Sequence, residues 1–134
     1  VRHRLAGGVT LTFETELNED FEAVTDRKRV QQVLINLLTN AEKNTEKGSI
    51  ILSCKKIENT DMISFTVTDT GIGIPVERMD EIFQRYKKLD DKKQGSGLGL
   101  DICRTIAKKL NGEINIDRQY TNGARFYFNI PYNA

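Results

Sequence analysis

A single apolar stripe on one helical segment most constrains how this chain can fold. The stripe lies within residues 26–44 at the spacing of an α-helix, and its members are Val30, Val33, Leu34, Leu37, Leu38 and Ala41. Asp26 precedes the stripe, and its carboxylate suits the N-cap of such a helix. Because only one side of the helix is apolar, it must lie on another layer and cover it.

The remaining segments predict that the second layer is a sheet. Apolar and polar residues alternate at 9–17 and 62–68, and strand-like segments are also found at 50–57, 113–117 and 125–130. A short strand is predicted at 21–24, and two further helices at 75–86 and 98–110. The predicted fold is α+β, a two-layer α/β sandwich in which about five strands form a mixed, mostly antiparallel sheet covered on one face by three helices.

The composition is that of an ordinary globular domain. A chain of 134 residues with a formal net charge of +1 predicts one domain, with no general attraction to nucleic acid or to an anionic membrane. No apolar run is long enough to span a membrane. Cys54 and Cys103 lack metal or redox spacing, so we expect structural thiols in a reducing, cytoplasmic compartment. The chain begins at Val1 rather than at methionine, and we expect it to be part of a longer protein.

Two glycine clusters are candidate ligand-binding loops. The first, Asp69-Thr70-Gly71-Ile72-Gly73-Ile74-Pro75, follows a predicted strand, and its carboxylate can accept a hydrogen bond from an amine on a base. The second, Gly95-Ser96-Gly97-Leu98-Gly99-Leu100, opens a predicted helix, where free N–H groups and the helix dipole favour an anion. The second cluster is neither a Walker loop nor a dinucleotide fingerprint. Each cluster alone is also compatible with an ordinary turn or a hinge.

Polar residues on the long helix form a third candidate feature. Asn36, Asn40 and Lys43 fall along one edge of the apolar stripe at about 100° per residue. Amide oxygens can ligate Mg²⁺ and a lysine can hold a phosphate, although each residue alone is compatible with a solvated helix flank. Together with the glycine clusters, this edge predicts an Mg-nucleotide site covered by a mobile basic lid at residues 75–99.

Four motifs in order carry a resemblance to a known family. They are Asn36-Leu37-Leu38-Thr39-Asn40-Ala41 (N box), Asp69-Thr70-Gly71-Ile72-Gly73-Ile74-Pro75 (G1), Glu81-Ile82-Phe83 (F) and Gly95-Ser96-Gly97-Leu98-Gly99-Leu100 (G2). From about Val9 to Pro131 the chain resembles the catalytic, ATP-binding (HATPase_c) domain of two-component sensor histidine kinases. That domain has the Bergerat fold, shared with gyrase, Hsp90-type chaperones and mismatch-repair ATPases.

The resemblance implies roles for individual residues. Asp69 would bind the adenine amine. Asn40 and Asn36 would hold Mg²⁺ against the phosphates with Lys43 beside them, and these three would be the catalytic residues. The other nucleotide-binding residues that the resemblance implies are Asn44, Gly71, Gly73, Ile74, Phe83, Lys88, Gly95, Ser96, Gly97, Leu98, Gly99 and Leu100.

Two of these residues would belong to the lid, and a third departs from the family pattern. Phe83 would anchor the lid, and Lys88 matches a position where relatives often carry an arginine near the γ-phosphate. Asn44 stands where many relatives place an aromatic residue against the adenine, so a stacking contact is missing from this chain.

The resemblance also implies a reaction and partners. The domain would bind ATP and Mg²⁺ and donate the γ-phosphoryl group to a histidine on a separate dimerisation domain, for relay to an aspartate of a response regulator receiver domain. The one histidine here, His3, is followed by Arg4 and lies outside any helical pattern, so the acceptor domain is expected to be absent. The isolated domain would be monomeric and cytoplasmic, within a protein that can itself be a membrane-anchored sensor.

Three other functions stay open at this stage. A serine kinase of the anti-sigma-factor type and an ATP-hydrolysing switch of the gyrase or chaperone kind both usually carry a glutamate base where this chain has Asn36. A histidine acceptor can rely on a carboxylate in its own domain, so Asn36 favours the histidine kinase. A degenerate module that only binds nucleotide is the third alternative.

Overall fold

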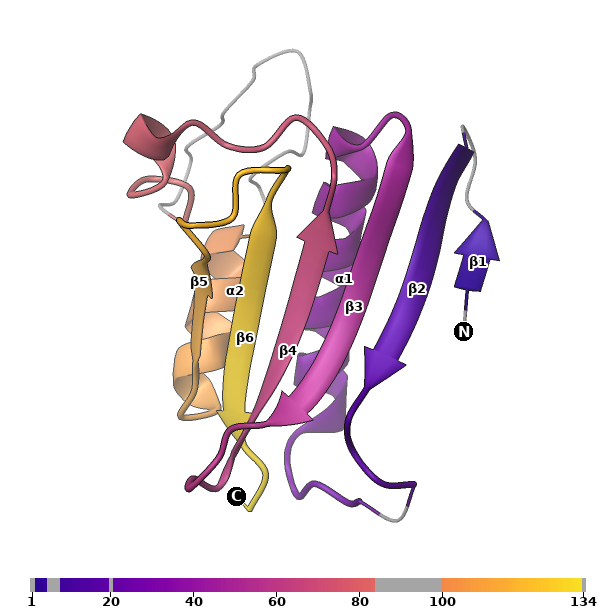
Figure 1. Cartoon of the computed structure of the whole chain (residues 1–134). Helices are drawn as coiled ribbons and strands as arrows, with labels where there is room; N and C mark the ends of the chain where they lie inside the picture. The colour runs from indigo at the N-terminus through magenta and orange to yellow at the C-terminus, as the bar shows by residue number, and fades with distance from the viewer. Residues whose placement is uncertain (1, 5–7, 20, 84–99, 134) are drawn as a thin grey trace.

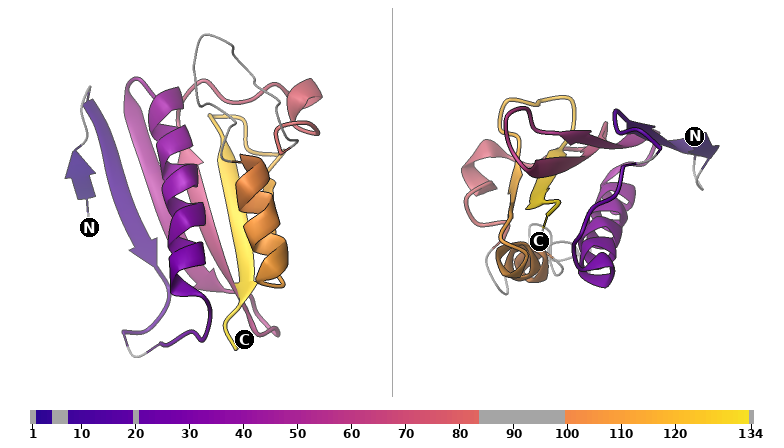
Figure 2. Two further views of the ribbon diagram at one scale, coloured as in Figure 1. Left: turned by 180° about the vertical axis from the view of Figure 1, so that it is seen from behind. Right: turned by 90° about the horizontal axis from the view of Figure 1, so that it is seen from below.

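Six strands form one sheet and two α-helices cover one of its faces in the part of the chain that the structure describes, residues 2–4, 8–19, 21–83 and 100–133 (Figures 1 and 2). The structure is a computed structural model. Its elements in chain order are β1 (Arg2–Arg4), β2 (Val9–Thr15), α1 (Arg27–Asn44), β3 (Gly48–Lys56), β4 (Met62–Asp69), the 3₁₀ turn η2 (Val76–Arg78), α2 (Leu100–Lys109), β5 (Glu113–Ile116) and β6 (Arg125–Pro131). The predicted two-layer α+β architecture is confirmed.

The sheet is mixed, as the sequence predicts. Its strand order is β1-β2-β3-β4-β6-β5. Strands β2 and β3 are parallel because α1 connects them, whereas the other neighbouring strands described in the sheet are antiparallel. The sequence predicts about five strands; the sixth is β1, an edge strand of three residues, too short to show a hydrophobic period.

Helix α1 begins and packs as its sequence predicts. The Oδ1 atom of Asp26 accepts a hydrogen bond from the N–H of Arg29 at 3.2 Å, which caps the helix. The apolar stripe faces the sheet, and its fully buried members are Val30, Val33, Leu37 and Ala41. None of the helices in the described part of the chain is long and apolar enough to cross a membrane.

The hydrophobic core lies between the two helices and the sheet (Figure 2). Alternate residues of β6 point inward: Phe126, Phe128 and Ile130 are all buried. Phe128 stacks on Phe65 of β4, with ring centroids 6.0 Å apart. No helix of the described residues covers the other face of the sheet, in agreement with a single covered face. Both cysteines are buried and free, as expected of structural thiols.

The predicted helix at 75–86 is wrong in the described residues. Only the single 3₁₀ turn η2 is present there, with an i→i+3 hydrogen bond of 3.1 Å from the N–H of Met79 to the carbonyl of Val76. The buried residues Met79 and Ile82 lie three apart, which suits a 3₁₀ period and gives too short an apolar run for an α-helix. Residues 84–86 lie outside the described part of the chain.

Two further boundaries differ from the prediction. The short strand at 21–24 is reduced to an isolated bridge between Val24 and Asn133, because no neighbouring strand continues beside it. Helix α2 is described from Leu100, and its predicted start at residue 98 falls outside the described residues.

Candidate functional site

Asp69 ends β4 as a nearly buried carboxylate, with 2% of its surface exposed. Its Oδ1 atom accepts hydrogen bonds from the backbone N–H groups of Gly71 at 2.9 Å and of Ala124 at 3.2 Å. Its own N–H donates to the carbonyl of Ala124 at 2.8 Å. The carboxylate is therefore held from two sides, by the turn that follows β4 and by the residue that precedes β6.

The electrostatic environment of this carboxylate is unusual. Burial raises the pKa of Asp69 above its ordinary 3.8, while the N–H groups of Gly71 and Ala124 act in the opposite direction. Both hydrogen bonds go to Oδ1, and no residue in the described ranges donates to Oδ2. A carboxylate that is nearly buried and keeps one oxygen for an external donor can recognise an N–H group such as an amine.

The turn after β4 is pressed against the C-terminal end of α1. The N–H of Ile72 donates to the carbonyl of Asn44 at 3.1 Å. Gly71 lies so close that a Cβ atom there would overlap this carbonyl. Gly73 adopts a φ of +74°, which favours glycine. Both glycines are therefore needed for the turn to reach the helix.

The polar edge of α1 runs from α2 to this turn. Near its start, Nδ2 of Asn36 donates to Sγ of Cys103 in α2 at 3.6 Å. Near its end, the Asn44 carbonyl holds the turn after β4. Half-buried Asn40 lies one helical turn from each, and Lys43 is exposed in the last turn of α1. The end of α1, the turn after β4 and the β5–β6 connection gather at one end of the sheet (Figure 1).

A comparison with protein families decides what this arrangement is. The model described as histidine kinase-, DNA gyrase B- and HSP90-like ATPase matches residues 25–134. The chain belongs to this ATPase family. The match takes in α1, the turn after β4, residues 81–83 and the start of α2, which carry the predicted N, G1 and F boxes and the last residue of G2.

Known relatives of this ATPase domain include a sensory kinase and a sensor protein. The adaptive-response sensory kinase SasA of Trichormus variabilis is 38% identical over 121 residues, which make up 88% of this chain and 30% of that protein. The aerobic respiration control sensor protein ArcB of Escherichia coli is 34% identical over 128 residues, 92% of this chain and 16% of that protein. The chain thus spans less than a third of the length of these relatives.

A solved structure of similar extent is the catalytic domain of the histidine kinase ThkA. It superposes with a TM-score of 0.80 at 36% identity, covering 93% of this chain and 80% of that one. The resemblance to the catalytic domain of a histidine kinase, predicted from the four boxes, is confirmed.

Three other predicted site residues of the ATPase domain lie in or against its core. Phe83 is 8% exposed and meets Phe126 edge to face, with ring centroids 6.1 Å apart. Leu100, the first residue of α2, is buried, and Ile74 packs partly against the same core. Six predicted residues lie outside the described part of the chain and stay predictions: Lys88, Gly95, Ser96, Gly97, Leu98 and Gly99.

The amide oxygens of Asn36 and Asn40 on α1 fit Mg²⁺ only together with phosphate oxygens. Within the described ranges, no group of three or more His, Cys, Asp or Glu side chains could hold a metal ion. Asn36 uses its amide nitrogen toward Cys103, so its amide oxygen is left as an acceptor. Mg²⁺ prefers oxygen ligands and usually keeps waters and substrate phosphates, so amide oxygens beside a triphosphate suit it.

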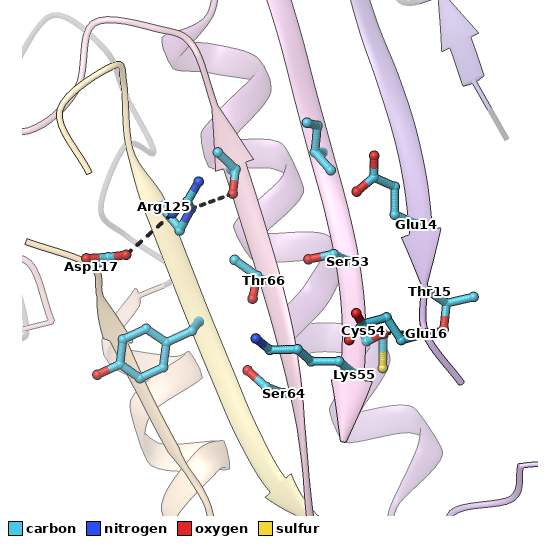
Figure 3. A pocket seen from close by; sticks show the side chains of 13 residues that line it. Glu14, Thr15, Glu16, Ser53, Cys54, Lys55, Ser64, Thr66, Asp117 and Arg125 are labelled. Carbon is cyan, nitrogen blue, oxygen red and sulfur yellow. Dashed lines mark hydrogen bonds and ion pairs between the residues drawn. The ribbon is translucent and has the colours of Figure 1, made fainter. Parts of the chain in front are cut away.

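Two hollows lie near the site without forming it. A hollow of about 320 Å³ is lined by residues 72–76 and 79 and by the β5–β6 connection. A larger one, of about 540 Å³, lies on the open face of the sheet, where Glu14, Lys55 and Arg125 line it (Figure 3). Neither lining includes a residue of α1, so neither is the space between Asp69 and the polar edge of that helix.

Sequence reasoning missed two residues that hold Asp69. The hydroxyl of Tyr120 donates to the backbone carbonyl of Asp69 at 3.1 Å, and the N–H of Ala124 donates to its carboxylate. The one nearby signal in the sequence is the pair Asn122-Gly123, which is typical of a turn between two strands. A turn signal says where the chain reverses, but it does not say which strand the loop will contact.

Proposed function

We propose that this domain binds Mg-ATP and donates the γ-phosphoryl group to a histidine on the dimerisation domain of a sensor histidine kinase. The observation that carries the proposal is the state of Asp69, whose Oδ1 is occupied by two backbone N–H groups while Oδ2 takes no donor from the described residues. At C6 of the purine, adenine carries an amine and guanine a carbonyl oxygen. A carboxylate acceptor that faces C6 therefore favours adenine over guanine.

The phosphates would lie along the polar edge of α1. Asn36 and Asn40 would contribute amide oxygens to Mg²⁺, and Lys43 would contribute positive charge. When bound, Mg²⁺ neutralises the charge on the phosphates, and phosphoryl transfer is mainly a matter of such neutralisation and of positioning. Residues 75–99 would close over the phosphates as a lid, with Phe83 as its anchor, Lys88 near the γ-phosphate and the glycines at 95, 97 and 99 allowing it to fold.

Two solved relatives support the choice of nucleotide and partner. ShkA, whose structure contains AMPPNP, superposes with a TM-score of 0.78 at 26% identity. ThkA, whose structure includes the response regulator TrrA, superposes with a TM-score of 0.75 at 33% identity. On this likeness we propose ATP as the nucleotide, a receiver domain as the final phosphoryl acceptor, and a role in two-component signalling in the cytoplasm.

Asn36 favours histidine over serine or water as the first acceptor. An amide cannot remove a proton, so it cannot activate a serine hydroxyl or a water molecule. The contact from its amide nitrogen to Cys103 turns that end of the side chain toward α2. A histidine needs no base on this domain, because a carboxylate beside it on its own domain can take the proton.

The test is transfer of labelled phosphate to an acceptor. The chain, joined to the helices of its own dimerisation domain, is incubated with Mg²⁺ and ATP labelled at the γ-phosphate, and the product is treated with acid and with alkali. Label that is lost in acid and kept in alkali identifies phosphohistidine and supports the proposal. Acid-stable label on serine, or ATP hydrolysis without label, would contradict it.

The matched control is Asp69→Asn in the same protein. The substitution keeps the size of the side chain and an oxygen for the two N–H groups, but its amide can no longer act purely as an acceptor. Labelling should fall to background in this variant. Labelling at the wild-type level would remove Asp69 from the base-binding site even if phosphohistidine forms.

A further inference from the structure

Among the described residues, Tyr120 is the one whose side chain hydrogen-bonds to Asp69; the other groups that hold Asp69 belong to the backbone. We propose that Tyr120 is a positioning residue that sets the selectivity of the site for adenine by fixing the orientation of Asp69. This inference rests on the proposed function, because it assumes that the Asp69 carboxylate meets the base. Tyr120 itself is placed outside the nucleotide contacts and acts only through Asp69.

The geometry around the Asp69 backbone supports this role. The Tyr120 hydroxyl donates to the Asp69 carbonyl at 3.1 Å, and the Asp69 N–H donates to Ala124 at 2.8 Å. The peptide that begins with this carbonyl ends at the N–H of Thr70, which donates to the Ser49 carbonyl at 3.1 Å, and the N–H of the next residue, Gly71, binds the carboxylate. A rotation of the peptide would therefore change the direction in which Oδ2 points.

The same carbonyl is also packed tightly on its other side. A Cβ atom at Gly123 would overlap the Asp69 carbonyl oxygen and would lie 2.9 Å from Oδ1. Gly123 has a φ of +149°, in the region that favours glycine. The β5–β6 connection thus surrounds Asp69 with a close-packed glycine, two backbone contacts of Ala124 and the Tyr120 hydroxyl.

Arg125 holds the Tyr120 ring in place from the open side of the sheet. Its guanidinium carbon lies 4.2 Å from the centre of the ring, the geometry of a cation–π contact. Its Nε donates to Oγ1 of Thr68 at 3.0 Å, and its Nη1 lies 3.6 Å from Oδ2 of Asp117 (Figure 3). Because the guanidinium is fixed by two neighbours, the ring against it is fixed as well.

Selectivity depends on this arrangement because the bases of ATP and inosine triphosphate differ at two adjacent ring positions. Inosine triphosphate carries a carbonyl oxygen at C6, where ATP carries an amine, and its N1 carries a proton, where N1 of adenine is an acceptor. A well-oriented carboxylate binds the amine and repels the carbonyl oxygen. A carboxylate free to turn does both less well, so the ratio of the two affinities reports on its orientation.

The test is Tyr120→Phe, which keeps the ring and its contact with Arg125 and removes only the hydroxyl. The dissociation constants of Mg-ATP and of Mg-inosine triphosphate are measured by titration calorimetry for the wild type and the variant. We expect the affinity for ATP to fall about three- to tenfold, the usual effect of one hydrogen bond. The affinity for inosine triphosphate should stay within about twofold, so that the ratio of affinities falls.

The matched control is Tyr127→Phe, which removes a tyrosine hydroxyl from the open face of the sheet, away from Asp69. It should leave both affinities unchanged. An equal loss for both nucleotides in Tyr120→Phe would indicate a merely structural effect and would overturn the inference, as would no loss at all. If wild-type protein binds ATP no better than inosine triphosphate, both the inference and the proposed role of Asp69 are wrong. A wild-type preference that Tyr120→Phe leaves unchanged in size refutes the inference alone.

Discussion

The carbonyl of Asn44, the last residue of α1, accepts a hydrogen bond from the N–H of Ile72 at 3.1 Å. This contact ties the end of the helix that carries the Asn36–Asn40 edge to the turn that follows Asp69. Two motifs far apart in the chain thereby become one rigid unit. A substitution that moves the turn should therefore also move the end of α1 and the side chains along its Asn36–Asn40 edge.

We expect Gly71→Ala to lower the stability of the fold. Its Cβ atom would overlap the Asn44 carbonyl, so the turn would have to move away from α1 and weaken the Asn44–Ile72 hydrogen bond. Forcing an extra methyl group into such a contact costs about 1–3 kcal/mol. Urea denaturation measures the change. Ile72→Ala is the matched control in the same turn, because its side chain is 73% exposed and its backbone is unchanged; an equal loss in both variants would contradict the steric explanation.

Asp69→Asn should raise stability at neutral pH while removing nucleotide binding. Burial raises the pKa of Asp69, so the folded state holds the proton up to a higher pH than the unfolded state does. The free energy of unfolding therefore falls as the pH rises from the pKa of Asp69 in the unfolded state to its higher pKa in the folded state. The neutral amide of the variant does not ionise, so it causes no such fall. We expect the variant to melt a few degrees higher at about pH 7 and the difference to vanish below about pH 4.

Calorimetric melting curves across this pH range check the prediction. Asp80→Asn serves as a control, because the Asp80 side chain is exposed and pairs with Arg118 at the surface, where an ion pair contributes little. A wild-type protein that is more stable than Asp69→Asn at neutral pH would mean that the carboxylate gains more from its hydrogen bonds than it loses by burial.

On the proposed function, Asn40→Ala should weaken nucleotide binding only when Mg²⁺ is present. The Asn40 side chain makes no hydrogen bond to another residue in the described ranges, so the fold should tolerate the change. We expect about a tenfold loss of affinity for Mg-ATP, typical of a contact to a charged group, and no loss in EDTA. Gln32→Ala, on the exposed side of the same helix, should have no effect. Equal losses with and without Mg²⁺ would remove Asn40 from the metal site.

Both cysteines should react very slowly while the chain is folded. Burial raises the pKa of the Cys54 and Cys103 thiols to about 11 in each case, so roughly one thiol in a thousand is ionised at pH 8. A colorimetric disulfide reagent should label two thiols at once in denaturant and almost none in native buffer. Rapid labelling of the native protein would mean that α2 separates from α1 and exposes Cys103.

Much of the architecture could be predicted because its signals are local. The stripe from Val30 to Ala41 has the period of a helix, and its buried members are those that the period indicates. The alternation in β4 and the N-cap at Asp26 are equally local, and both are confirmed. The four boxes also indicated the family, because their residue types and their order along the chain resemble those of its known members.

Local signals were less reliable where the apolar run was short. Residues 75–83 contain a proline, two glutamates and three buried apolar positions, a pattern that fits one helix or a 3₁₀ turn equally well. The three residues of β1 have no period at all, and they form a strand only because β2 offers them a free edge. In both cases the conformation of the segment depends on the element packed beside it and not on its own sequence.

Sequence alone determined where α1, α2 and the main strands lie and which side chains are candidates for the chemistry, because each of these signals depends on residues a few positions apart. Tertiary structure decided what those side chains touch. The placement of β6 between β4 and β5 brings Ala124 and Tyr120 to Asp69, and the packing of α2 on α1 brings Cys103 to Asn36. These contacts join residues 51 to 67 positions apart, and they exist only once the sheet order and the helix packing have been chosen by burial of the core as a whole.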